Sequence, residues 1–243
     1  MKKIIPEIPG EMSYNLAGYY VIRKKPLAFG SKIQETIYTC SSCINDSLLE
    51  HWSYSWTTDN NGYIDKIQEN YQITEDAVNS IRKWADNALD NKKVGWINVF
   101  ADLSTAKEYK KTFFAHLSDI DVMAVYLSKK DSDALIKEFQ PKEENFGLLG
   151  LYENLIKTIP EIDSESEKFL GFDIIGIELD GGFHSFHCHD ISDFLVQKFA
   201  LRPNQYGLFQ EVEDWTPILD HMNDQESGYE PVPWFVCKTK LVI

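Results

Sequence analysis

Basic residues are scarce in this sequence: 24 lysines and arginines stand against 38 aspartates and glutamates, and the net charge is −14. A negative field of this strength repels phosphate backbones and anionic lipid headgroups. Nucleic acids and membranes are therefore not expected as partners. A basic protein surface would instead be attracted to this chain and would associate with it faster.

Cysteines are also few, and no apolar run approaches the length that spans a bilayer. Four cysteines in 243 residues are too few for a disulfide scaffold, which favours a reducing compartment. The N-terminal segment has two lysines, but Pro6 and Glu7 interrupt anything that resembles the apolar core of a signal peptide. We therefore expect a cytoplasmic protein.

Motifs of several enzyme classes are missing as well. The segment Phe100–Ser104, between a predicted strand and a predicted helix, contains no glycine and cannot form a glycine-rich phosphate loop. The chain has no G-x-S-x-G nucleophile elbow. Cys188 projects toward the apolar side of its predicted strand, where a thiol stays protonated and unreactive. Nucleophilic catalysis is therefore not expected.

Strand and helix patterns alternate through the middle of the chain. The clearest helix spans residues 74–91, with an apolar stripe at helical spacing. Strand patterns at 96–100 and 122–127 alternate with helix patterns at 104–117 and 131–139. This order is typical of a βαβ unit with parallel strands.

We predict that residues 1–243 form a single domain of the α/β to α+β class, with a mixed twisted sheet and flanking helices. Residues 1–93 would supply N-terminal strands and a helix. Residues 94–243 would supply the βαβ unit, an antiparallel hairpin at Phe172–Asp190 and an acidic C-terminal region. The last strand is predicted at residues 234–242, after two prolines.

The hairpin is the strongest local pattern, because two β-prone runs flank Gly181-Gly182, a pair that favours a two-residue turn. In the register that such a turn sets, Ile177 faces Phe186 and Ile175 faces Cys188 on a mostly apolar side.

The other side of the hairpin would carry two imidazoles and a carboxylate, from His187, His189 and Glu178. A two-histidine, one-carboxylate set can bind a metal ion and leave positions open for water or substrate. This pattern gives an alternative function, a metal-dependent hydrolase. Partly buried structural histidines are the competing interpretation, and our main prediction includes no metal and no cofactor.

Cys40 and Cys43 form a single CxxC pair. A zinc site would offer a second cysteine pair or a histidine pair, and a redox site would place the first thiol at a helix N-terminus. Neither pattern follows in the sequence, so we interpret the two residues as ordinary buried or partly exposed thiols.

Carboxylates accumulate near the C-terminus, and no lysine or arginine occurs between Arg202 and Lys238. Solvated acidic faces are common, but aromatic anchors inside a charged rim are also typical of protein interfaces. Carboxylates there would steer and select a basic partner. The predicted partner-binding residues are Glu211, Glu213, Asp214, Trp215, Asp220, Asp224, Glu226 and Tyr229.

Three segments in the last third of the chain read GFDI at Gly171–Ile174, NQYGL at Asn204–Leu208 and EPVPWF at Glu230–Phe235. Together they resemble parts of the immunity proteins of bacterial polymorphic-toxin systems. The resemblance implies a small, acidic, cytoplasmic antidote that binds a cognate toxin domain and blocks its active site, with no catalytic residues of its own. We therefore predict a non-enzymatic protein that neutralises a basic toxin domain by occlusion.

Overall fold

A computed structural model describes residues 13–23, 38, 46–47, 68–69, 71–95, 99–138, 149–162, 164–177, 183–189, 197–210 and 212–243. Its strands are β1 (Tyr14–Arg23), β2 (Asp46–Ser47), β3 (Ile120–Ser128), β4 (Glu167–Ile177), β5 (Phe183–Ser185) and β6 (Trp234–Val242). Its helices include α3 (Glu75–Asp90), α4 (Leu103–Phe114), α5 (Lys129–Glu138), α6 (Leu149–Leu155), α8 (Thr216–Met222) and the 3-10 turn η2 (Phe186–His189).

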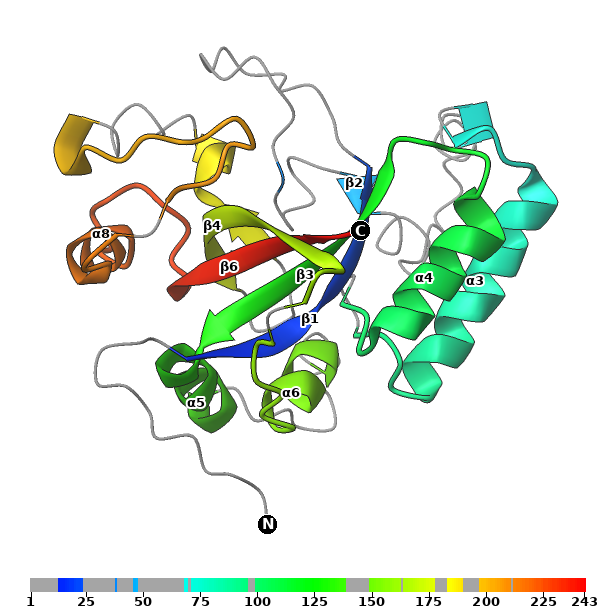
Figure 1. The fold of residues 1–243 in the computed structure, drawn as a ribbon, viewed down its shortest axis with the longest axis horizontal. Coiled ribbons are helices and arrows are strands. Elements are labelled where there is room, and N and C mark those ends of the chain that lie inside the picture. The colour runs from blue at the N-terminus through cyan, green and yellow to red at the C-terminus, as the bar shows by residue number, and fades with distance from the viewer. Residues whose placement is uncertain are drawn as a thin grey trace.

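The strands form one curled antiparallel sheet with the order β2-β1-β3-β6-β4-β5 (Figure 1). The last strand of the chain, β6, lies in the interior of this sheet between β3 and β4. In that position Val236 pairs with Ile174, and Thr239 pairs with Val125. The C-terminal strand therefore joins the earlier and the later halves of the chain.

The predicted parallel βαβ unit is not found among the described strands, because every pair of them is antiparallel. Phe100 forms isolated antiparallel bridges with Tyr19 and Val94, and β3 pairs with β1 and β6. The fold is therefore α+β. Alternation of strands and helices along a chain does not fix which strands become neighbours, and here two antiparallel partners flank β3.

Helices α3 and α4 lie side by side at one end of the sheet (Figure 1). The predicted start of α3 is confirmed: Thr74 is its N-cap and accepts a hydrogen bond from the Ala77 amide at 3.2 Å. Trp84 of α3 lies 4.7 Å from Tyr109 of α4, measured between ring centroids. This aromatic contact joins the two helices.

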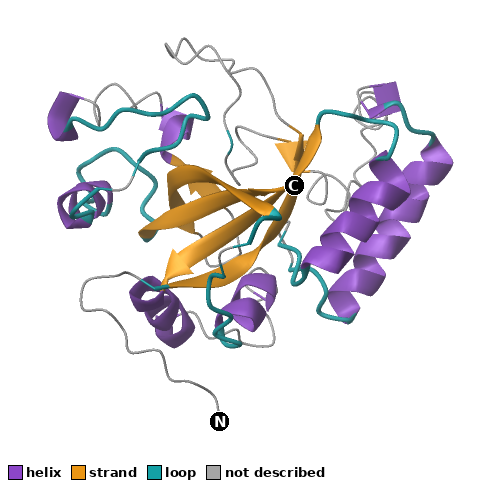
Figure 2. Cartoon of the chain, in the orientation of Figure 1, coloured by secondary structure: helices purple, strands orange, loops and turns teal. Residues whose placement is uncertain are grey.

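Adjacent residues of β1 point into two apolar layers on opposite faces of the sheet. Tyr19 belongs to the layer that α3, α4 and the α8 region cover, whereas Tyr20 belongs to the layer packed against Leu135 of α5 and Leu151 of α6. Figure 2 shows these helices around the sheet, with α3 and α4 at its right end, α5 and α6 below it and α8 at the left. Within the described residues, no helix combines the length and the apolar character that crossing a bilayer requires.

Candidate protein-binding surface

The acidic C-terminal segment is built around the short helix α8. Pro217 occupies a first-turn position, where its missing amide hydrogen costs nothing. The Thr216 amide donates a hydrogen bond to Oδ1 of Asp214 at 2.9 Å, and this bond lowers the pKa of the Asp214 carboxyl. Beyond the helix, Oδ1 of Asn223 accepts a hydrogen bond from the Trp234 amide at 2.9 Å. The segment is thus tied to the start of β6.

The two aromatic residues predicted as interface anchors lie in the core. Trp215 and Tyr229 are each 7% exposed. The Trp215 ring is 5.7 Å from that of Phe172, and the Tyr229 ring is 5.4 Å from that of Trp234. A helix as short as α8 is unstable alone and needs large apolar side chains to hold it against the sheet. Only a small part of each ring is therefore open to a partner, and the prediction that these two residues contact one stays a prediction.

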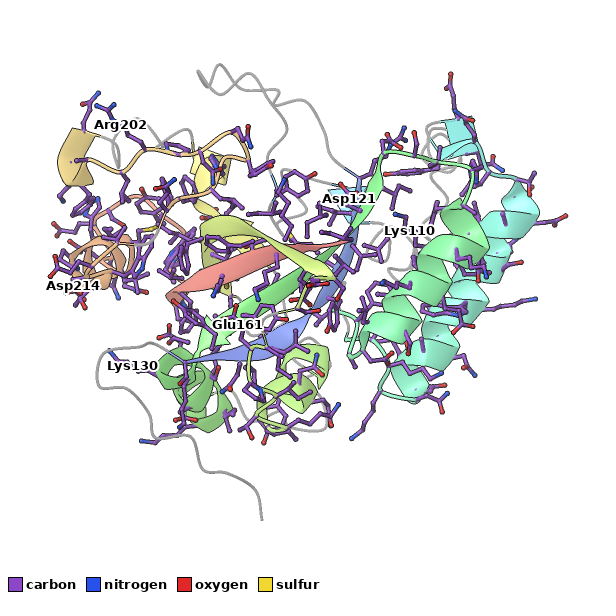
Figure 3. All side chains as sticks on the ribbon, viewed as in Figure 1. Lys110, Asp121, Lys130, Glu161, Arg202 and Asp214 are labelled. Atoms are coloured by element: carbon purple, nitrogen blue, oxygen red, sulfur yellow. The ribbon has the colours of Figure 1, made fainter. Side chains whose placement is uncertain are left out.

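The predicted carboxylates, in contrast, are at the surface. The exposed members of the set are Glu213, Asp214, Asp220, Asp224 and Glu226. Glu211 lies outside the described residues. Figure 3 shows Asp214 beside α8, at the outer edge of the molecule. The structure therefore exposes these five acidic side chains, here called the carboxylate row after their order along the chain, on a segment whose aromatic residues are buried.

The fold also brings residues of α5 next to this acidic segment, which the sequence analysis missed. Lys130 and Asp131 line the same cavity as Glu213 and Asp214. Figure 3 shows Lys130 and Asp214 on the same side of the molecule. No sequence signal indicates this proximity, because the residues belong to distant parts of the chain.

The β4–β5 hairpin exists, but its predicted register is wrong. Ile175 pairs with Ser185 and Ile177 pairs with Phe183, three positions earlier than the two-residue turn predicts. The ladder stops there because Phe186, fully buried, starts η2 and packs 4.7 Å from the ring of Phe209. His187 therefore lies in a 3-10 turn and not on a strand face.

His187 is a buried residue, and its ring has a specific partner. It is 6% exposed, and Nε2 lies 2.7 Å from the carbonyl oxygen of Gly207, so this nitrogen carries the hydrogen and donates it. Burial lowers the pKa of His187 to about 4, although the hydrogen bond to Gly207 acts in the opposite direction. The imidazole is therefore neutral at pH 7.

The metal site proposed for the hairpin stays a prediction. Glu178 and the side chain of His189 lie outside the described residues. Within the part of the chain that the structure describes, no three histidine, cysteine or carboxylate side chains are placed to hold a metal ion. Cys40 and Cys43 also lie outside that part, while Cys237 of β6 is buried.

A buried charge cluster is a second feature that the sequence analysis missed. The Nζ atoms of Lys238 and Lys240 each lie 2.6 Å from Oε1 of Glu161. Burial alone would raise the pKa of Glu161, but the hydrogen bonds from these lysines lower it below its ordinary value. Nζ of Lys240 also lies 3.7 Å from Glu167, whose carboxylate accepts a hydrogen bond from the Tyr126 hydroxyl at 2.9 Å. Each charge in this cluster has an opposite charge beside it.

Two of the three segments singled out in the sequence, GFDI and NQYGL, are in contact. The Asn204 side chain donates to the Leu170 carbonyl at 2.7 Å, next to Gly171 of β4, and its Oδ1 accepts from the amides of Tyr206 and Leu208. Gly171 has a φ of +144°, and a Cβ there would lie 2.7 Å from Leu208 Cβ. The GFDI and NQYGL segments thus form one structural unit.

Comparison of this chain with protein-family models, with curated proteins and with solved structures found no match.

Proposed function

We propose that this chain is a non-enzymatic binding protein that recognises a basic protein surface, and that it acts as an immunity protein that occludes the basic active site of a cognate bacterial toxin. The observation that carries this proposal is the exposed carboxylate row between Glu213 and Glu226, held on a buried aromatic base. The resemblance of the last third of the chain to immunity proteins gives the partner class.

The rigidity of the segment supports a role in binding. Ile218 and Met222 of α8 are buried with Trp215, so the backbone that carries the carboxylates is fixed before a partner arrives. A preorganised surface loses less conformational entropy on binding than a segment that must fold onto its partner. Exposed carboxylates on such a surface raise the association rate of a basic protein and exclude acidic ones.

The buried positions of the two aromatic residues change which groups would supply apolar contact. Val212, Leu219 and Val232 pack against the core but are only partly buried. They lie on the same segment as the carboxylates. Their exposed parts would add apolar area inside a charged rim, as protein interfaces require.

Co-expression tests the proposal directly. Cells that express the toxic gene adjacent to the gene for this chain should survive when the wild-type chain is present. The double variant Asp220→Lys/Asp224→Lys should lose most of that protection, because two steering carboxylates become repulsive cations. The matched variant Asp86→Lys/Asp90→Lys makes the same charge change on exposed positions of α3 and should protect like wild type.

Equal protection by both double variants would refute the surface assignment. No protection by the wild-type chain would refute the immunity function. Stoichiometric zinc, iron or manganese in the purified protein, lost in His187→Ala, would support the alternative metal-dependent hydrolase instead.

A further inference from the structure

A cavity of about 370 Å³ opens between the start of α5 and the start of α8. Its apolar wall includes Tyr14 of β1 and Trp215, the N-cap residue of α8. Its charged wall includes Lys130, Asp131, Glu213 and Asp214. The cavity therefore combines aromatic rings with charges of both signs at the edge of the carboxylate row.

Negative charge is in excess around this cavity. Lys129 also lines it, but its Nζ lies 2.8 Å from Oδ2 of Asp133 and is thereby matched. Lys130 is the second cation, and its positive charge favours the ionised forms of both Asp131 and Asp214. Three carboxylates, those of Asp131, Glu213 and Asp214, therefore line the cavity with two ammonium groups, one of which is paired with Asp133 outside the lining. A further cation would be bound more favourably than a further anion.

The aromatic wall favours a planar cation. Trp215 is 93% buried by the packing of its ring, and within the described residues its indole Nε1 has no hydrogen-bond partner. A guanidinium group can stack on tryptophan or tyrosine and bind carboxylates in a bidentate fashion, whereas an ammonium acts as a point charge. A backbone carbonyl next to an inserted arginine could accept the indole hydrogen.

We propose that this cavity is an anchor pocket for an arginine side chain of the basic partner. The assignment rests on the proposed function, because it places one specific residue class of the partner beside the carboxylate row. Glu213 and Asp214 bind the guanidinium, and the aromatic wall stacks against its plane. The positive charge of Lys130 weakens the binding of every cation to the pocket. Simple cations, which make no stacking contact with the aromatic wall, are therefore bound less well than a guanidinium.

Acetyl-arginine amide is a suitable probe, since it carries the guanidinium without other charges. The readout is the indole N–H resonance of Trp215, assigned by its loss in Trp215→Phe. Titration should shift this resonance saturably, and acetyl-glutamine amide should not. Glu213→Gln should weaken binding about tenfold, in the range of a lost charge-assisted hydrogen bond. Asp86→Asn on α3, which changes the net charge equally, should leave the affinity unchanged.

Lys130→Gln gives the sharpest result, because the pocket then loses a cation. Affinity for acetyl-arginine amide should rise several-fold. Weaker binding in Lys130→Gln would mean that the pocket holds an anion, and this would overturn the proposal. Equal weakening by Glu213→Gln and Asp86→Asn, or no shift of the Trp215 resonance in wild type, would overturn it too.

The pocket and the proposed function can fail separately. A pocket that binds the probe, in a chain that protects no cell, would leave the pocket and remove the immunity function. Protection that depends on Asp220 and Asp224, in a chain whose Trp215 resonance never shifts, would leave the function and remove the pocket.

Discussion

Charged residues occur in two contrasting regions of this molecule. On one face of the sheet, Glu161 pairs with Lys238 and Lys240, and these side chains are largely buried. Around α8, Asp220 and Asp224 are exposed to solvent. In the first region each charge is neutralised within the chain and contributes to folding. In the second region the carboxylates produce a negative potential at the surface, which would attract a positively charged partner.

The two regions differ because of what covers them. The segment after α6 crosses the edge of β1, where the Glu161 amide donates to the Tyr14 carbonyl at 2.8 Å and the Leu16 amide donates to the Ile159 carbonyl at 2.9 Å. This crossing places the Glu161 carboxylate over β6. At α8 the buried side chains are aromatic and aliphatic, so the carboxylates are left at the surface.

The largest effect is expected at the base of the acidic segment. Trp215→Ala should lower the free energy of unfolding by about 4 kcal/mol, because a buried indole leaves a cavity beneath α8. Urea denaturation followed by far-ultraviolet circular dichroism measures this change. A loss below about 1 kcal/mol would show that Trp215 is a surface residue, as the sequence analysis predicts. The contrast between a buried Trp215 ring and exposed carboxylates would then be wrong.

Removing the central carboxylate of the buried cluster should cost nearly as much. Glu161→Ala leaves two lysine charges on β6 without their shared partner, and breaking a buried ion pair in this way costs about 3 kcal/mol. Glu153→Ala is the matched control, since Glu153 pairs with the exposed Lys92 at 3.0 Å and should cost under about 1 kcal/mol. Equal losses in the two variants, measured by urea denaturation, would contradict the distinction between the regions.

The stability of the chain should depend on pH through His187. Its pKa is about 4 in the folded chain against an ordinary value of 6.5, so the unfolded chain binds the proton more tightly. Its contribution is complete above pH 6.5 and is lost as the pH falls toward 4. This group should remove about 2 kcal/mol of stability between pH 7 and pH 5.

His187→Gln keeps a hydrogen-bond donor but cannot titrate in this range, so the difference between wild type and variant isolates the histidine from the many carboxylates. Parallel pH profiles of the two proteins in urea denaturation would refute a buried, neutral His187.

The smallest effect is expected in the acidic row. Asp220→Asn and Asp224→Asn should each change the free energy of unfolding by no more than about 0.5 kcal/mol, because exposed charges contribute little to folding. A thermal denaturation series measures this. A large destabilisation in either variant would mean that the carboxylate serves the fold and is not available to a partner.

Local patterns in the sequence predicted individual elements well. The last strand was predicted at 234–242, which matches β6, and Thr216-Pro217 marks the start of α8. Thr74 begins α3 as expected. Alternation, a proline in the first turn and a capping side chain are each visible within a few neighbouring residues.

Pairings between distant segments could not be predicted in this way. Nothing local in β6 shows that it lies between β3 and β4, so the sheet was expected to be partly parallel. The predicted hairpin register is wrong because Ile177 pairs with Phe183, so that five residues and not two connect the strands.

For the same reason, the exposure of the residues in the acidic segment was predicted only in part. Exposure of Asp220 and Asp224 follows from their own charge, whereas the burial of Trp215 depends on Phe172 of a distant strand. Lys240 of β6 is buried and Lys238 is partly buried, and both pair with Glu161 of a segment that is distant in sequence, so no local pattern indicates this cluster.

The central proposal is that the carboxylates around α8 attract a basic partner, and its most direct test is the association rate with the proposed partner, a basic toxin domain that we expect to be encoded beside this chain. We expect that Asp220→Lys/Asp224→Lys slows association at least tenfold at low ionic strength, and that added salt narrows its difference from wild type. Asp86→Lys/Asp90→Lys on α3 should retain a rate near that of wild type. An association rate that neither double variant changes, or one that salt does not alter, would contradict the claim.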